Sequence, residues 1–219
     1  MLEVEYRKKQ DISKLKYLRE KIRYGEQIIY FADVESSFVV GIVDIVGSTL
    51  VSSKLNNTEV AKYYGIFLNS MARIIREHEG VIIKNIGDSL LYYFKTNVVD
   101  KNDILQPLEC CMTMTECEGI INDIMWDEGL PRIQYRVSAD YGKVMVAKTS
   151  TMTEIDVFGS TVNYCSKINS IAKPNGFVIG HDMRILIGKT DKFSFTENTY
   201  FASSLKQRYP IYHVGRSPC

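Results

Sequence analysis

The chain has 219 residues, of which 45% are hydrophobic and 24% are charged, and its 27 basic and 26 acidic side chains leave a net charge of +1. This composition predicts one globular domain with a small appendage, and the near-zero charge excludes a global field that would attract nucleic acid or an anionic membrane. No apolar run approaches the roughly 20 residues of a membrane span. The first ten residues also lack the apolar centre of a signal peptide, so we expect a cytoplasmic protein without a membrane span or a nucleic-acid partner.

The first 35 residues are rich in Lys, Arg, Glu and Tyr. Apolar residues from Ile12 to Ile29 recur roughly at helical spacing, which predicts an N-terminal helix that ends near Gly25. Such a helix could pack on the domain, stabilise a dimer, or connect the domain to a partner or regulator. The five cysteines include no CxxC pair, which favours reduced thiols over disulfides or a zinc site.

Residues 36–49 read SSFVVGIVDIVGST, which is the pattern of a buried strand that stops at Gly47. Asp44 lies close to the end of this apolar run. Because an ionised carboxylate is costly to bury beside Val and Ile, Asp44 needs a cation or several hydrogen-bond donors. A helix capped near Asn57 follows and ends at Gly80.

Residues 81–94 read VIIKNIGDSLLYYF, two β-rich runs joined by the turn pair Gly87 and Asp88. This pattern predicts a two-residue β-hairpin with Asp88 on the turn and Lys84 four residues earlier. Taken alone, the segment could also be a solvent-exposed hairpin with an ordinary surface lysine.

The remaining elements continue the alternation of helices and strands. We expect a helix over 104–126, interrupted or begun near Pro107, and a second hairpin over 132–147 that turns at residues 140–142. A helix over 159–172, a strand over 177–180, a helix over 181–187 and a last strand over 209–214 complete the chain. This order predicts an α/β (α+β) domain with an antiparallel-rich sheet and helices packed on one face of it.

Two carboxylates, Asp44 and Asp88, end β-runs that would be neighbours in such a sheet. Together with a backbone carbonyl such as that of Ile45, they provide the hard oxygen ligands that Mg²⁺ or Mn²⁺ accepts. A pair of such ions can activate a hydroxyl group and neutralise a triphosphate during an in-line displacement. Two aspartates at strand ends are weak evidence without a third feature.

The third feature is the resemblance of four sequence segments to a known family. In order and spacing, GIVDIVGST, IIKNIGDSLLYYF, RVSADYGKVMVA and IDVFGSTVNYCSKINSIAKPNG resemble the catalytic domain of class III nucleotidyl cyclases. The resemblance implies a catalytic domain over residues 36–219, an N-terminal helical segment over residues 1–35, and a ferredoxin-like βαββαβ-type fold.

The resemblance also assigns roles to the candidate residues. Asp44, Asp88 and the carbonyl of Ile45 stand where the family holds two divalent cations, Mg²⁺ or Mn²⁺. Lys84 and Asp156 stand at the positions that read the base. An ammonium can donate to N1 of adenine while a carboxylate accepts from its exocyclic amine, whereas guanine presents the opposite pattern, so this pair favours ATP.

Three further residues match positions around the ribose and the phosphates. Asn163 matches the asparagine that orients the ribose, and Lys206 resembles the lysine that contacts the triphosphate, although Gln207 replaces the usual glycine after it. Lys167, one helical turn after Asn163, replaces the family's transition-state arginine. A lysine supplies the charge without the planar bidentate fork, so the enzyme could be slow, Lys167 could suffice, or Arg132, Arg136 or another cation could substitute for the arginine.

The implied function is an adenylate cyclase that converts ATP to 3′,5′-cyclic AMP and pyrophosphate. Family members share each site between two chains, so the resemblance implies a head-to-tail homodimer with two equivalent sites. Two alternatives stay open: a cyclase for a pyrimidine nucleotide or GTP, and a degenerate domain that binds a nucleotide for regulation. Lys167 is the only direct support for the second alternative.

Overall fold

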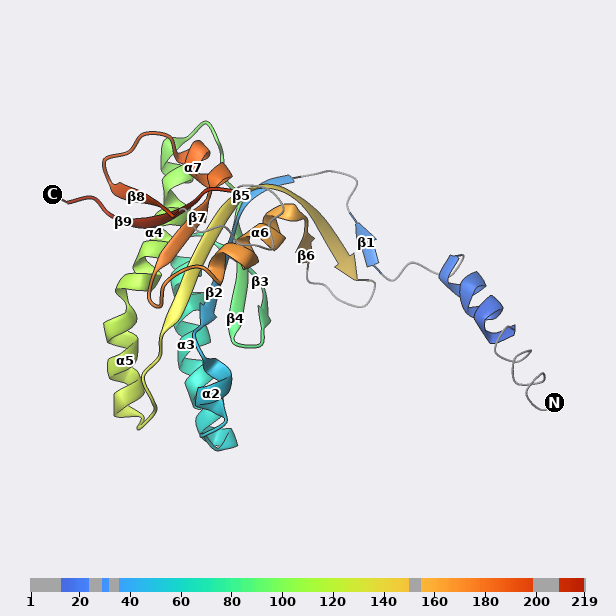
Figure 1. Ribbon diagram of the computed structural model, residues 1–219, viewed down its shortest axis with the longest axis horizontal. Helices are drawn as coiled ribbons and strands as arrows, with labels where there is room; N and C mark the ends of the chain where they lie inside the picture. The colour runs from blue at the N-terminus through green and yellow to red at the C-terminus, as the bar shows by residue number, and fades with distance from the viewer. Residues whose placement is uncertain (1–12, 24–28, 32–35, 150–154, 199–208, 219) are drawn as a thin grey trace.

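A computed structural model describes residues 13–23, 29–31, 36–149, 155–198 and 209–218 (Figure 1). Its main sheet has the strand order β3-β4-β2-β5-β7-β9-β8, and β1 and β6 pair with β5 beside this path. All strand pairs are antiparallel except β5 with β7. The strands are β1 (Ile29–Phe31), β2 (Ser36–Ile45), β3 (Val81–Ile86), β4 (Ser89–Phe94), β5 (Tyr135–Thr149), β6 (Ile155–Phe158), β7 (Phe177–Gly180), β8 (Phe193–Asn198) and β9 (Ile211–Arg216). The antiparallel-rich α/β fold is therefore confirmed.

The two faces of β2 are both apolar and both are covered. Alternate residues such as Val39 and Val43 join a core with α3 (Asn57–Glu77), α4 (Lys101–Glu116), α5 (Glu118–Asp127) and α7 (His181–Ile187). Val40 and Ile42 point the other way and pack with Cys165 of α6 (Ser160–Asn169). The expectation of helices on a single face was wrong, because a strand that is apolar on both faces must be buried on both.

The predicted hairpin over 132–147 is one continuous strand. β5 pairs with β2 without a break, from Ser36 opposite Val144 to Ile45 opposite Tyr135. Gly142 lies opposite Phe38 in this ladder and is not among the glycines with positive φ. Ten paired residues thus override the local turn preference of the Asp-Tyr-Gly sequence. The far end of β5 extends beyond β2 and pairs with β1 and β6.

Several other boundaries differ from the prediction. The region expected as one helix over 104–126 contains α4 and α5, which are separated at Cys117, and Pro107 lies within α4. The cap of α3 is Asn56, one residue earlier than expected, and it forms a capping box with Glu59. Sequence patterns did not predict the short helix α2 (Ser48–Ser52) or the strands β1 and β8.

The N-terminal helix is confirmed over residues 13–23, and all of its described side chains are exposed. Ile12 and Ile28, which were predicted to share its apolar face, lie outside the described residues, and Ile29 belongs to β1. No helix in the described part of the chain is long and apolar enough to cross a membrane.

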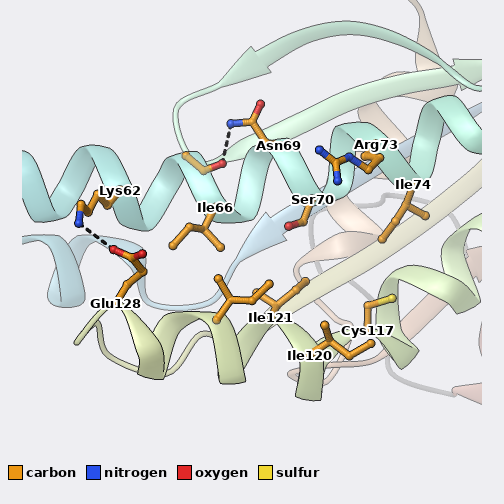
Figure 2. Close-up of a pocket in the computed structure, with 12 residues that line it drawn as sticks. Lys62, Ile66, Asn69, Ser70, Arg73, Ile74, Cys117, Ile120, Ile121 and Glu128 are labelled. Atoms are coloured by element: carbon orange, nitrogen blue, oxygen red, sulfur yellow. Dashed lines mark hydrogen bonds and ion pairs between the residues drawn. The ribbon is translucent and has the colours of Figure 1, made fainter.

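A hollow of about 670 Å³ lies between α3 and α5. Figure 2 shows Ile66 of α3 on one side of it and Ile121 of α5 on the other, with the Lys62–Glu128 ion pair at one end. Its lining includes none of the residues that the sequence singled out as candidate site residues. The residues of the candidate site lie elsewhere: Asp44 is near the end of β2, and Asp88 directly precedes β4.

Candidate active site

The hairpin of β3 and β4 forms as predicted, with strand bounds that leave only Gly87 and Asp88 in the turn. Gly87 has a φ of 61°, a left-handed conformation that glycine adopts without steric cost. The turn therefore fixes Asp88 at the tip of the hairpin. Ser89, the next residue, lies opposite Asp44 of β2.

Asp44 and Asp88 are electrostatic neighbours. The pKa of Asp44 is raised from 3.8 to about 6, mainly by burial and also by the negative charge of Asp88, whereas the nearby Arg136 opposes the shift. Arg136 lies opposite Asp44 on β5, so the three charges come from adjacent strands. The sequence prediction that these strand ends neighbour each other is confirmed.

This carboxylate pair fits a divalent cation chemically. Asp44 is half-buried beside a second carboxylate, and both conditions disfavour its ionised form, so a bound cation would be stabilised by this carboxylate and would stabilise it in turn. The described residues contain no cluster of three or more His, Cys, Asp or Glu side chains that could hold a metal. A cation here would therefore depend on Asp44, Asp88 and backbone oxygens such as that of Ile45, whose buried side chain anchors the end of β2.

Lys84 and Asp156 form an ion pair across 72 positions of sequence. A bulge in β3 contributes to this contact: the register shifts between Ile82 and Lys84, so that Lys84 lies opposite Leu91. Ile83 and Leu91 both belong to the core on the α6 side of the sheet. The bulge thus aims Lys84 toward the side of the sheet on which α6 packs.

Asp156 is the second residue of the four-residue strand β6. One of its carboxylate oxygens accepts a hydrogen bond from the Val157 N–H at 2.9 Å, and the other meets Lys84. The side chains of Lys84 and Asp156 stay 42% and 31% exposed. Both groups are therefore oriented by the protein and still accessible to a ligand.

Asn163 and Lys167 lie one turn apart on α6, as predicted. The opposite face of the helix is tied to the sheet: the Cys165 thiol contacts the Val40 carbonyl, and the Asn169 amide donates to the Ile42 carbonyl at 3.1 Å. This anchoring leaves Asn163 exposed on the outer face. Lys206 lies outside the described residues.

The structure thus brings the predicted residues into three groups: the pair Asp44 and Asp88, the pair Lys84 and Asp156, and the outer face of α6. It also draws attention to Arg136, which the sequence suggested only as one possible substitute for the missing arginine. Its Nε is buried and has no hydrogen-bond partner among the described residues. An arginine within the β-rich run that starts at residue 132 was the available sequence signal.

Comparison with known proteins gives one family. The family model described as adenylate and guanylate cyclase catalytic domain matches residues 28–212. An adenylate cyclase of Streptomyces coelicolor is 27% identical over 146 residues, which are 67% of this chain and 33% of that protein. A cytidylate cyclase of Staphylococcus aureus is 25% identical over 158 residues, 69% of this chain and 37% of that protein. The chain therefore spans little more than a third of the length of these relatives.

Solved structures agree on the fold. The guanylyl cyclase Cya2 has a TM-score of 0.76 at 23% identity, with 84% of this chain and 94% of that chain covered. The adenylyl cyclase CyaB from P. aeruginosa has the same TM-score at 21% identity, with 84% and 96% covered. At this identity the likeness shows a shared fold. The two proteins are named for different nucleobases, guanine for Cya2 and adenine for CyaB.

Proposed function

Since the chain belongs to the adenylate and guanylate cyclase catalytic domain family, we propose that it cyclises ATP to 3′,5′-cyclic AMP and pyrophosphate. The observation that carries the choice of ATP is the ion pair between Lys84 and Asp156, which presents one donor and one acceptor side by side. The relatives named adenylate cyclases support the same choice.

In this proposal, Lys84 donates to N1 of adenine and Asp156 accepts from the exocyclic amine. The Val157 N–H and the ion pair hold the carboxylate in place, so little side-chain freedom is lost on binding. Guanine would place an N–H against Lys84 and a carbonyl against Asp156, and both protein groups would lose their partners.

Asp44, Asp88 and the Ile45 carbonyl would hold two divalent cations, Mg²⁺ or Mn²⁺. When bound, such ions lower the pKa of the ribose 3′-hydroxyl and neutralise the charge that develops on the phosphates. The half-buried position of Asp44 beside Asp88 supports this role, because burial and the neighbouring negative charge both raise the pKa of Asp44 and a bound cation would offset them.

The chemical step forms a bond between the 3′-oxygen and the α-phosphorus. The bond from the α-phosphorus to the bridging oxygen of pyrophosphate breaks, and the 3′-hydroxyl loses its proton. In the proposal, Asn163 orients the ribose and Lys167 faces the α-phosphate. Arg136, whose charge lies beside Asp44 on the neighbouring strand, is a further cation for the phosphates in this proposal. A triphosphate contact by Lys206 stays a prediction.

We expect the site to be completed across a head-to-tail homodimer. One chain would supply the carboxylates Asp44 and Asp88, and its partner would supply the base-reading pair and α6. Two equivalent sites per dimer would result, and the isolated chain would be inactive.

CTP is a second candidate substrate, favoured by the cytidylate cyclase of Staphylococcus aureus among the relatives. The Watson–Crick edge of cytosine carries a ring-nitrogen acceptor beside an exocyclic amine, which is the same pattern as in adenine. Lys84 and Asp156 can therefore bind either base, and they disfavour guanine and uracil alike. The size of the base pocket must then distinguish ATP from CTP.

The test is incubation of the purified protein with ATP, GTP, CTP or UTP in separate reactions with Mn²⁺, followed by mass spectrometry of the products. Cyclic AMP as the main product is expected, and dominant cyclic CMP would favour the second candidate. Asp44→Ala should abolish the product, whereas Asp127→Ala, at the exposed end of α5, is the matched control. Calorimetric ATP binding without turnover, unchanged in Asp44→Ala, would instead show a degenerate nucleotide-binding module.

A further inference from the structure

Tyr209, which lies just before β9, places its hydroxyl group between two carboxylates. The hydroxyl donates to Oδ2 of Asp140 at 2.7 Å, and Oδ2 of Asp182 lies 3.1 Å away. The Asp182 N–H in turn donates to the phenolic oxygen at 3.2 Å. Asp140 is 1% exposed, so this hydrogen bond is shielded from water.

The Asp140 carboxylate is itself fixed by the backbone around it. Its other oxygen accepts from the N–H groups of Tyr141 at 2.9 Å and Met183 at 3.3 Å. A Cβ atom at position 180 would lie 2.3 Å from Asp140 Oδ2, so only glycine permits this approach. Strand β5 and helix α7 together therefore provide a rigid anchor for Tyr209.

The ring of Tyr209 stacks on Tyr164 of α6. The ring centroids lie 5.0 Å apart and the planes differ by 20°. Tyr164 directly follows Asn163 and precedes Lys167 by three residues, so the stack touches the helix beside both candidate site residues. Neither tyrosine has a part in the chemistry proposed above.

The geometry of α6 shows what the stack adds. The helix is hydrogen-bonded to the sheet through Thr161, Cys165 and Asn169, which share one face. At 3.6 residues per turn, Tyr164 projects about 60° from Lys167, on the flank between the buried face and the outer face. Contacts on one face fix the position of a helix axis, and a contact on the flank restrains its rotation about that axis.

We propose that Tyr209 and Tyr164 form a positioning pair that sets the rotation of α6 and thereby orients Asn163 toward the ribose of the substrate. The inference rests on the proposed function. Neither tyrosine touches substrate in this scheme: Tyr209 acts through Tyr164, and Tyr164 acts through Asn163.

Three variants test the pair, each assayed for kcat and KM with ATP. Tyr164→Leu removes the stacking ring and should lower kcat about tenfold or more, because small misplacements of an orienting group are costly. KM should change less than twofold, since Lys84 and Asp156 are untouched.

Tyr164→Phe keeps the ring and should have a kcat close to that of the wild type. Tyr209→Phe loses the anchor to Asp140, so its kcat should resemble that of Tyr164→Leu. Tyr17→Leu, at an exposed ring of the N-terminal helix, is the control.

A double-mutant cycle separates positioning from a merely structural role. If Tyr164 acts through Asn163, Tyr164→Leu should have no further effect on kcat in an Asn163→Ala background. Equal losses in both backgrounds would overturn the inference while leaving the cyclase assignment intact.

Amide hydrogen exchange provides a readout that needs no turnover. Exchange over residues 160–169 should accelerate in Tyr164→Leu and Tyr209→Phe, while exchange over α3 stays as in the wild type. Unchanged exchange in α6 would overturn the positioning pair. A wild-type protein that makes no cyclic nucleotide would refute the proposed function instead, and the exchange data would still decide whether the pair restrains α6.

Discussion

At the scale of single residues, Lys167 is the main departure from the pattern that the family resemblance implies. It lies on α6 one turn after Asn163, where the resemblance leads us to expect an arginine. A lysine provides one compact charge, whereas arginine can make two parallel hydrogen bonds to a phosphate. Lys167 is therefore the position at which an improvement in rate is most plausible on chemical grounds.

Lys167→Arg should raise kcat for ATP by about threefold or more, because the guanidinium adds a second hydrogen bond to the developing charge. The measurement is steady-state kinetics with Mn²⁺, with Lys173→Arg as a control for the same substitution just beyond α6. A fall of tenfold or more would show that the geometry of the lysine itself is required.

Asp140 is a second residue with an unusual environment. The pKa of Asp140 is raised from 3.8 to about 7, mainly by burial and to a smaller extent by the charge of Asp182, whereas the hydrogen bond from Tyr209 lowers it. Cys165 also faces it. Tyr209 lies within hydrogen-bond distance of both carboxylates but can donate its single phenolic hydrogen to only one of them at a time. When Asp140 carries a proton, Asp140 can donate to the phenolic oxygen while Tyr209 donates to Asp182, so that both contacts become hydrogen bonds.

The raised pKa predicts how stability depends on pH. Between about pH 4 and 7 the folded state holds a proton on Asp140 that the unfolded state has lost, so this contribution to stability falls as pH rises and levels off above 7. Asp140→Asn keeps the shape and cannot ionise. Relative to the wild type, its free energy of unfolding should rise by on the order of 2 kcal/mol between pH 5 and pH 8. Urea unfolding at both pH values measures this, and parallel curves for the two proteins would contradict it.

At the scale of elements, the β3–β4 hairpin could be predicted from the sequence because its information is local. Two β-rich runs around a Gly-Asp pair leave few alternatives, and the strand bounds agree with the structure. β5 could not be predicted in the same way. Its Asp-Tyr-Gly sequence favours a turn locally, and only pairing with β2, about 100 residues earlier in the chain, keeps the segment extended.

The candidate site likewise contains one feature that could be predicted from local sequence and one that could not. From residue chemistry alone, Asp44 could be predicted to need a cation or hydrogen-bond donors, and the structure provides the cation Arg136 beside it, together with the second carboxylate Asp88. The contact between Lys84 and Asp156 could not be derived from spacing, since it depends on the bulge at Ile83 and on the pairing of β6 with β5. For that pair, only the family resemblance provided a prediction.

Exchanging the charges of Lys84 on β3 and Asp156 on β6 tests whether these two strands read the base. The double variant Lys84→Glu with Asp156→Lys keeps an ion pair and reverses donor and acceptor. It should lose ATP turnover and raise the ratio of GTP to ATP turnover by about tenfold or more, because guanine matches the reversed pattern. Competition between the two nucleotides, analysed by mass spectrometry, gives this ratio directly. An unchanged ratio would remove both residues from base recognition.

At the scale of the whole molecule, the three groups of candidate residues lie on different elements: the ends of β2 and β4, the β3–β6 contact, and the outer face of α6. Lys84 and Asp88 are only four residues apart on one hairpin, yet the proposal assigns them to the base and to the metal ions. In a head-to-tail dimer these neighbours would serve different sites. The hairpin would then connect the two sites of the dimer.

Mixing two impaired variants tests this arrangement. Asp88→Asn removes a metal ligand and Asn163→Ala removes the ribose contact, so each homodimer should keep only a small residual turnover and still elute as a dimer in size-exclusion chromatography. In a mixed dimer, one site combines the intact Asp88 of one chain with the intact Asn163 of the other, while the second site carries both defects. Random exchange makes half of the dimers mixed, each with one working site of two, so about one quarter of wild-type activity should return.

Recovery should require unfolding and refolding the two proteins together, and mixing two aliquots of Asp88→Asn is the control. No recovery, with mixed dimers present by mass spectrometry, would show that each chain builds its site alone.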